Sequence, residues 1–259
     1  TVLYHVGSKN ERDDRTGMAH FFEHLLFEGS ENIARGEFDS YVENAGGILN
    51  ANTSQDRTFY YELLPSNQLE LGLWLESERM LHAKIEQIGI DTQNEVVKEE
   101  KRQRYDNQPY GQLLPATMAL AYSEHPYQWT PIGSMEHLDA STHADFMEFY
   151  NTFYVPENAT LSIAGDLNIA EAKSLIAKYF SDIPRGVRNI PRPTVVEPIR
   201  TAEVRDTIYG KDRLPLVVQA YPIPAQGTPD YYAVDLLNQV LSGGESARLN
   251  QRVVENDQL

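Results

Sequence analysis

The stretch that decides the fold reads Gly17-Met18-Ala19-His20-Phe21-Phe22-Glu23-His24-Leu25-Leu26-Phe27-Glu28-Gly29. Thr16 is suited to cap the start of a helix and Gly29 to follow its end, so a helix is predicted over residues 17–28. Apolar side chains occupy nearly every side of this helix: Met18, Phe21, Phe22, Leu25 and Leu26. A helix that is apolar all round is predicted to be buried.

Three polar side chains interrupt this apolar helix, namely His20, Glu23 and His24. Positions i, i+3 and i+4 share one face of a helix. Two imidazoles one turn apart can bind a single Zn²⁺, and the carboxylate beside them can take a proton from water that the metal activates. This order is the inverted zincin motif, H-x-x-E-H. It arises by chance about 0.03 times in a chain of this composition, and burying these groups without a cation would be costly.

A catalytic zinc site needs a third protein ligand, which must come from elsewhere in the chain. A helix predicted from Asp91 to about residue 104 offers Glu95, Glu99 and Glu100. Glu100 follows two apolar residues, Val96 and Val97, by one turn, which favours an inward position. The alternative is that all three glutamates lie on a solvated face, balanced by the neighbouring lysines and arginines. Spacing alone leaves both interpretations open.

The rest of the chain alternates between strand and helix patterns. Strands are predicted over residues 1–6, 48–54, 58–64 and 159–165, and further helices over 37–44, 67–83, 112–123, 141–153 and 168–180. This order predicts an α+β domain over residues 1–183. Four prolines make residues 184–200 a linker. Residues 201–259 then form the start of a second, similar and truncated domain, with strands over 201–209 and 214–221 and helices over 230–241 and 246–259.

Composition excludes several classes of protein. The 259 residues contain no cysteine, which excludes disulfides, thiolate metal ligands and a cysteine nucleophile. A net charge of −16 argues against a nucleic-acid binder, and no apolar stretch is long enough to span a membrane. The chain starts in a strand pattern and stops in a helix pattern, so we expect it to be part of a longer, soluble protein. The compartment stays open between bacterial periplasm, cytoplasm and organelle matrix.

Residues 17–30 resemble the signature of the pitrilysin, insulin-degrading enzyme and mitochondrial processing peptidase family of zinc metallopeptidases. Residues 46–58, 125–133 and 153–166 also match, and residues 242–249 match more loosely. In that family a glutamate downstream of the motif completes the metal site, and its position falls on Glu100. The resemblance therefore implies one Zn²⁺ held by His20, His24 and Glu100. It also implies a mixed, mainly antiparallel sheet packed by helices, in a type of domain that the family repeats.

The resemblance suggests further site residues. The family often carries a second glutamate seven residues before the glutamate ligand, where it supports the metal site, but this chain has Gln93 there. Glutamine can still form hydrogen bonds but adds no charge, which affects the tuning of the site rather than the metal itself. Family members bind substrate as an extra strand on a sheet edge, which here implies the strand at 48–54, with Asn50 and Ala51 as substrate-binding residues.

Together these features predict a zinc-dependent peptidase that hydrolyses oligopeptides or unfolded polypeptides, with Glu23 as general base. Its partners would be a peptide substrate and a second family half, in the same chain or in another. The alternative is a non-catalytic subunit of the same fold with a structural or substrate-presenting role. Such subunits usually lose part of the motif, whereas this chain has all three ligands and the base. A metal-dependent hydrolase of other substrates is a third possibility.

Overall fold

The computed structural model describes residues 1–186, 189–210 and 214–258. The chain forms two units, Thr1–Pro215 and Leu216–Leu259. Residues 187–188 of the predicted linker, residues 211–213 before the last predicted strand and residue 259 of the last predicted helix lie outside the described residues. The domain boundaries given above, at residues 183 and 200, stay predictions.

A four-stranded antiparallel sheet forms the centre of the first unit. Its strands are β1 (Val2–Tyr4), β2 (Ile48–Thr53), β3 (Thr58–Leu63) and β4 (Ala159–Leu161), in the order β2-β3-β1-β4. β2 and β3 form a hairpin in which Thr53 pairs with Thr58 and Ile48 with Leu63. β2 is therefore an edge strand that pairs on one side only. The predicted mixed fold with a mainly antiparallel sheet is confirmed.

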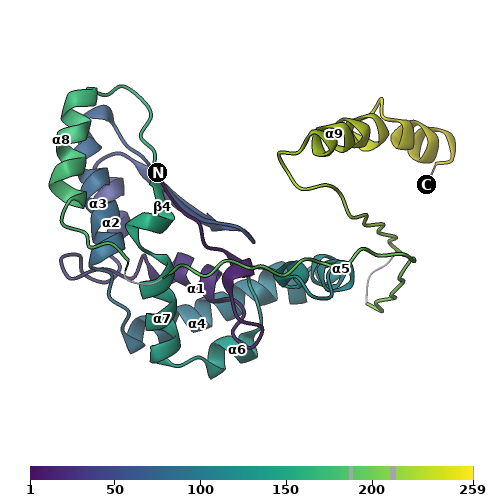
Figure 1. The fold of residues 1–259 in the computed structure, drawn as a ribbon, viewed down its shortest axis with the longest axis horizontal. Coiled ribbons are helices and arrows are strands. Elements are labelled where there is room, and N and C mark those ends of the chain that lie inside the picture. The colour runs from purple at the N-terminus through teal and green to yellow at the C-terminus, as the bar shows by residue number, and fades with distance from the viewer. Residues whose placement is uncertain (187–188, 211–213, 259) are drawn as a thin grey trace. The chain divides into compact units, whose positions relative to one another are not determined.

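In the view of Figure 1, helices of the same unit lie to the left of this sheet and below it. They are α1 (Met18–Leu25), α2 (Phe38–Asn44), α3 (Leu69–Leu81), α4 (Gln87–Lys101), α5 (Leu113–Ala121), α6 (Met135–Ala140), α7 (His143–Phe153) and α8 (Ile169–Phe180). α1 contacts β2 and β3 as well as α4 and α7, while α3 packs against α2 and α8. The short helix that carries the motif therefore lies between the sheet and two other helices.

The hydrophobic core is built around α1. Phe22 is completely buried, and its ring stacks on those of Phe149 and Tyr150 from α7, with centroids 5.5 and 6.1 Å apart. Val97 of α4 and Tyr60 of β3 are also fully buried in this cluster. Aromatic rings bury large areas and add favourable edge and stacking contacts. The predicted burial of the motif helix is confirmed.

Two helix predictions differ from the structure. The helix predicted to start at Asp91 begins at Gln87, one turn earlier, and Asp91 lies inside it, where its carboxylate accepts a hydrogen bond from Gln87. Buried Ile90 explains this start, because its packing rewards the extra turn. The helix over residues 141–153 is α7 alone, capped by Thr142, and α6 precedes it as a separate element.

The predicted strands over residues 201–209 and 214–221 are not formed in the described part of the chain. A strand needs a neighbour that satisfies its backbone N–H and C=O groups, and no strand in the described part of the chain pairs with these segments. Their apolar side chains stay exposed; Tyr209, for example, is 92% exposed. A strand pattern in the sequence thus indicates a preference for extended backbone, which forms a strand only when another strand pairs with it.

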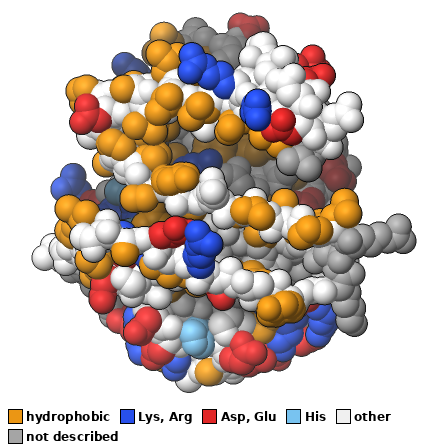
Figure 2. All heavy atoms as spheres, turned by 90° about the vertical axis from the view of Figure 1, so that its right-hand side faces the viewer, with side chains coloured by type: hydrophobic (Ala, Val, Ile, Leu, Met, Phe, Trp, Pro, Cys, Tyr) orange, Lys and Arg blue, Asp and Glu red, His pale blue; other side chains and the backbone are white. Residues whose placement is uncertain are grey.

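The second unit contains α9 (Pro229–Ser242), capped by Thr228, and a wide helical turn over Asn250–Asn256. Most large hydrophobic side chains that are exposed in the described residues belong to residues 195–254. Figure 2 shows hydrophobic side chains spread among charged ones on one face of the molecule. No helix in the described part of the chain combines the length and the apolar character that crossing a membrane requires.

Candidate metal centre

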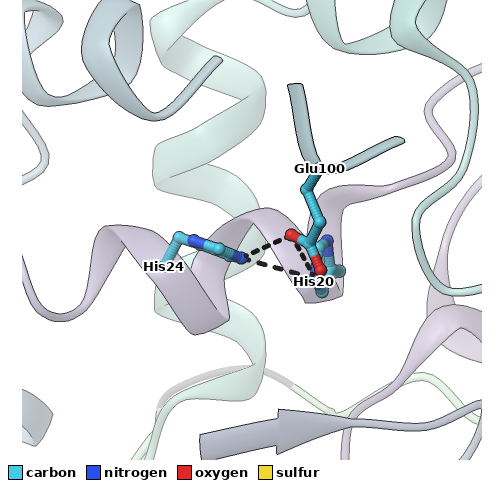
Figure 3. A group of neighbouring side chains, drawn as sticks. All are labelled: His20, His24 and Glu100. Carbon is cyan, nitrogen blue, oxygen red and sulfur yellow. Dashed lines mark hydrogen bonds and ion pairs between the residues drawn. The ribbon is translucent and has the colours of Figure 1, made fainter. Parts of the chain in front are cut away.

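His20 and His24 from α1 and Glu100 from α4 converge on one point (Figure 3). The Nε2 atoms of the two histidines lie 3.4 Å apart, and Glu100 Oε2 lies 3.4 Å from His20 Nε2 and 3.2 Å from His24 Nε2. One ligand atom from each residue falls within 4.8 Å of the others. The i, i+4 spacing of the histidines brings their rings together, as predicted.

The donor set fits a zinc ion. Glu100 Oε2 is buried, and no partner in the described residues gives it a hydrogen bond of proper geometry, although two imidazole nitrogens are close. Burial raises the pKa of Glu100, but its interactions with His20 and His24 outweigh this and hold the pKa well below its usual range. Two imidazoles and one carboxylate are a common protein ligand set for catalytic Zn²⁺. A cation at this point would satisfy the buried oxygen.

Glu100 is the only one of the three candidate glutamates on α4 that reaches this cluster. Glu95 and Glu99 are exposed and form ion pairs with Lys98 and Arg102, respectively. The apolar flank that pointed to Glu100 is only half correct, because Val97 is fully buried but Val96 is 43% exposed. The second oxygen of Glu100 pairs with Arg104 Nη1 at 2.8 Å, one turn further along the chain.

A buried carboxylate fixes the start of α1. Glu11 accepts hydrogen bonds from the backbone N–H groups of Gly17 and Ala19, at 2.9 and 2.8 Å. Gly17 occupies the N-cap position with φ of 96°, a left-handed conformation that favours glycine. The predicted N-cap, Thr16, is wrong, because its hydroxyl instead lies 2.9 Å from His137 Nδ1. Its two oxygens satisfy backbone N–H groups of the first turn, which have no partner inside the helix, so Glu11 takes the role of the cap. Burial raises the pKa of Glu11 to about 8, against the lowering effect of these hydrogen bonds.

A buried cation fixes the other end of α1. Arg79 donates from Nη1 to the backbone oxygen of Leu26 at 3.2 Å, and its guanidinium lies against the rings of Phe27, Phe38 and Tyr60. Arg79 also forms an ion pair with buried Glu76. Positive charge near a helix C-terminus is favourable. The helix that carries both histidines is therefore held at each end by hydrogen bonds with a buried side chain, Glu11 at its start and Arg79 at its end.

Removing the cap at Glu11 is expected to destabilise the fold. Glu11→Ala leaves two buried backbone N–H groups unpaired, so the free energy of unfolding should fall by about 2 kcal/mol. Glu11→Gln retains one acceptor oxygen and should cost less. Urea denaturation measures both. Glu43→Ala, on the exposed side of α2, is the control and should change stability by less than about 0.5 kcal/mol. A Glu11→Ala variant with the same free energy of unfolding as this control would contradict the capping role of Glu11.

Glu23 stands on α1 between the two histidines and contacts the edge strand. Its Oε2 accepts a hydrogen bond from Thr53 Oγ1 at 2.5 Å. Thr53 is the last residue of β2. Threonine is a common residue, and Thr53 and Glu23 belong to different segments of the chain. The sequence therefore gives no signal that predicts their contact. The contact ties the carboxylate predicted as the base to the strand predicted to bind substrate.

The remaining predicted site residues lie near the cluster but do not join it. Asn50 and Ala51 lie on edge strand β2, where Asn50 Oδ1 accepts a hydrogen bond from the backbone N–H of Ala51 at 2.8 Å. Gln93 donates a hydrogen bond from Nε2 to Glu28 Oε1 at 2.5 Å. Within the described residues it forms no hydrogen bond with His20, His24 or Glu100. Gln93 thus links α4 to the segment after α1, and its role in supporting the metal stays a prediction.

A surface depression of about 540 Å³ adjoins Glu100 on the outer face of α4, lined by Glu95, Val96, Glu99, Glu100 and Gln103. A second, of about 530 Å³, extends from Gln103 and Arg104 to Leu114. Both combine apolar and polar walls. Of the three residues of the cluster, Glu100 alone lines one of these depressions.

Known proteins are similar to this chain in sequence and in fold. A family model described as Insulinase (Peptidase family M16) matches residues 1–132, and one described as Peptidase M16 inactive domain matches residues 141–259. The chain is 36% identical over 261 residues to zinc protease PqqE of Helicobacter pylori, covering 100% of this chain and 59% of that protein. It is 28% identical to the probable mitochondrial-processing peptidase subunit beta of Schizosaccharomyces pombe, covering 71% and 40% of the two chains.

Solved structures agree. A protease from Helicobacter pylori superposes with a TM-score of 0.86 at 33% identity, covering 100% of this chain and 62% of that one. Pitrilysin shares the fold at a TM-score of 0.68 and 19% identity, over 76% of this chain and 21% of its own. The chain spans about three fifths of the length of the Helicobacter pylori relative. The resemblance noted in the sequence is confirmed, and the chain belongs to peptidase family M16.

Proposed function

We propose that this chain carries the active site of a zinc-dependent peptidase. The observation that carries the proposal is the convergence of His20 and His24 of α1 with Glu100 of α4, whose ligand atoms lie within 4.8 Å of one another. The same helix α1 also carries Glu23. The zinc protease relatives agree with it. No observation favours the non-catalytic alternative, because neither the ligand set nor the candidate base has lost a member.

The chain's own residues would divide the work of hydrolysis. His20, His24 and Glu100 would hold the zinc ion. When bound, zinc supplies Lewis-acid chemistry, which polarises a carbonyl group and makes water a better nucleophile. Glu23 would act as general base and accept a proton from the attacking water. Burial of the helix keeps these side chains in fixed positions, because α1 packs on both the sheet and α7.

The substrate would add to the free edge of β2 as a further strand. In an antiparallel pair, hydrogen-bonded and non-hydrogen-bonded residues alternate. The backbone N–H of Ser54 donates to the C=O of Arg57, so alternate residues counted back from Ser54 bond to β3. Those between them, Ala51 and Thr53 included, turn their backbone groups to the free edge. Pairing through the backbone gives affinity with little preference for sequence.

Asn50 has a specific part in this proposal. Its side chain covers the N–H of Ala51 in the free protein, as expected for an edge strand whose unpaired donors are protected. An arriving substrate carbonyl would replace Asn50 Oδ1 on that N–H. The released amide could then form its own hydrogen bond to the peptide.

Ala51→Pro is expected to weaken substrate binding. Proline removes the N–H at the free edge, yet it is tolerated on edge strands where that N–H does not pair within the sheet. Loss of one or two backbone hydrogen bonds should raise KM by about tenfold. Ile48→Ala, an exposed position on the same strand, serves as the control. Steady-state kinetics on a quenched fluorescent peptide give KM for both variants, and an unchanged KM in Ala51→Pro would exclude this edge as the docking site.

The proposed activity is tested on purified full-length protein. The protein is incubated with a set of unstructured peptides of about 10 to 30 residues, and the products are identified by mass spectrometry. Internal cleavage that requires zinc supports the proposal. Intact peptides in the presence of stoichiometric zinc, with every complementary family half supplied, would favour the non-catalytic alternative. We also propose that a second family half, in the same chain or a partner, completes the substrate chamber, since the relatives are longer than this chain.

A further inference from the structure

Thr53 is the single described residue that forms a recorded hydrogen bond with the carboxylate of Glu23. Its Oγ1 donates to Glu23 Oε2 at 2.5 Å, at the short end of the range for a hydrogen bond between two oxygen atoms. The other carboxylate oxygen, Oε1, has no recorded hydrogen bond within the described residues. The hydroxyl therefore fixes one oxygen of Glu23 and leaves the other available to accept a proton.

The hairpin fixes the backbone on both sides of Thr53 and so limits the positions of its hydroxyl. Thr53 pairs with Thr58 across the hairpin, and the next residue, Ser54, bonds to Arg57 through both its backbone and its side chain. Arg57 in turn donates to the side chain of Asn52 at 2.6 Å. The two residues that flank Thr53 are thus held by the same turn. A β-branched side chain on such a fixed backbone has few alternative rotamers.

The side chain and the backbone of Thr53 face different parts of the site. Side chains alternate across a strand, and Thr53 points its side chain toward α1, as Ala51 does where it packs on the core. Its backbone groups, by the alternation described above, turn to the free edge of β2. The same residue thus touches Glu23 with its hydroxyl and would touch the substrate strand with its backbone.

We propose that Thr53 is a positioning residue for Glu23, which aligns the carboxylate of the base with a peptide bound along β2. The inference rests on the proposed peptidase function and adds a residue to it. Without the hydroxyl, the Glu23 side chain can rotate about its terminal bonds and reaches the productive orientation less often. Substrate binding to the strand should change little, because the backbone groups at the edge remain.

Three variants test this role. Thr53→Val removes the hydroxyl and keeps the shape, while Thr53→Ser restores a hydroxyl. Thr58→Val is the matched control, because it makes the same chemical change in the paired residue of the hairpin, whose hydroxyl bonds the backbone oxygen of Val6 instead. Zinc content and the free energy of unfolding are measured for all three, so that loss of metal or of stability is separated from loss of alignment.

We expect Thr53→Val to lower kcat by about 10- to 100-fold with KM within twofold of wild type and zinc content unchanged. Thr53→Ser should recover most of kcat. Thr58→Val should lose stability without a comparable fall in kcat. A Thr53→Val protein with wild-type kcat would overturn the inference, and so would equal losses of kcat in Thr53→Val and Thr58→Val.

A binding measurement separates failure of this inference from failure of the proposed function. A peptide hydroxamate can bind zinc through its oxygens and donate a hydrogen bond to a neighbouring carboxylate. We expect Thr53→Val to weaken its affinity for the zinc-loaded protein by about tenfold, with no change in zinc affinity. Equal hydroxamate affinity in wild type and Thr53→Val would contradict the positioning role. Weaker affinity in a protein that cleaves no peptide would support that role and refute the peptidase proposal alone.

Discussion

Glu23→Gln is expected to lower kcat for peptide hydrolysis by about three orders of magnitude, with zinc still bound. Glutamine has almost the same shape as glutamate and can still accept the hydrogen bond from Thr53, but it cannot take a proton from water. The two histidines and Glu100 are untouched, so the metal content should stay at its wild-type value. Kinetics on a fluorescent peptide and elemental analysis of the same sample measure the two effects together.

The matched control for this experiment is Glu31→Gln. Glu31 lies seven residues beyond His24 and its side chain is 69% exposed, so the same chemical change there should leave kcat within about twofold. Peptide cleavage by Glu23→Gln at the wild-type rate would show that another group activates the water. A simultaneous loss of zinc would instead show that Glu23 takes part in holding the metal.

Glu100→Ala is expected to weaken zinc binding by about 100- to 1000-fold, because it removes one of the three proposed protein ligands. The remaining imidazoles from a single helix turn can still bind the ion, but weakly. Competition with a fluorescent zinc chelator gives the affinity. Activity should fall in parallel and return in part at high zinc concentration.

The neighbouring glutamate provides the control for the third ligand. Glu99→Ala alters a carboxylate on the same helix that is exposed and paired with Arg102. Its zinc affinity should match that of wild type. Full zinc occupancy in Glu100→Ala at nanomolar free zinc would contradict the proposal that Glu100 is the ligand from α4. A loss of zinc affinity in Glu99→Ala instead would also contradict it.

The part of the site that the sequence predicts best depends on local geometry. His20, Glu23 and His24 share a face because any helix places positions i, i+3 and i+4 together. The sequence predicts β2 as a strand paired with the next one, and the family resemblance implies its place at a sheet edge, where the structure has it. Glu100 needed the resemblance, because three glutamates on α4 have similar spacing and one of the two flanking valines is exposed.

The parts that the sequence did not predict depend on contacts between distant segments. Glu76, Ser77, Glu78 and Arg79 form a strongly polar run that hydropathy would place in solvent, yet all four are buried. Burial is possible because Arg79 finds Glu76, the oxygen of Leu26 and three aromatic rings. Glu11 is likewise surrounded by charged neighbours in the sequence and becomes a helix cap only when the loop folds over α1. Partners of this kind leave no periodic signal.

Removal and return of zinc is the most direct test of the proposed peptidase. The full-length protein is treated with a chelator, dialysed, and assayed on a cleavable peptide before and after zinc is added in steps. We expect hydrolysis to disappear on chelation and to return with a breakpoint at one zinc ion per site formed by His20, His24 and Glu100. The contrary result is measured with less than about one tenth of an equivalent of zinc bound. A rate of hydrolysis well above the fraction of sites that still hold zinc would contradict the proposed zinc-dependent peptidase.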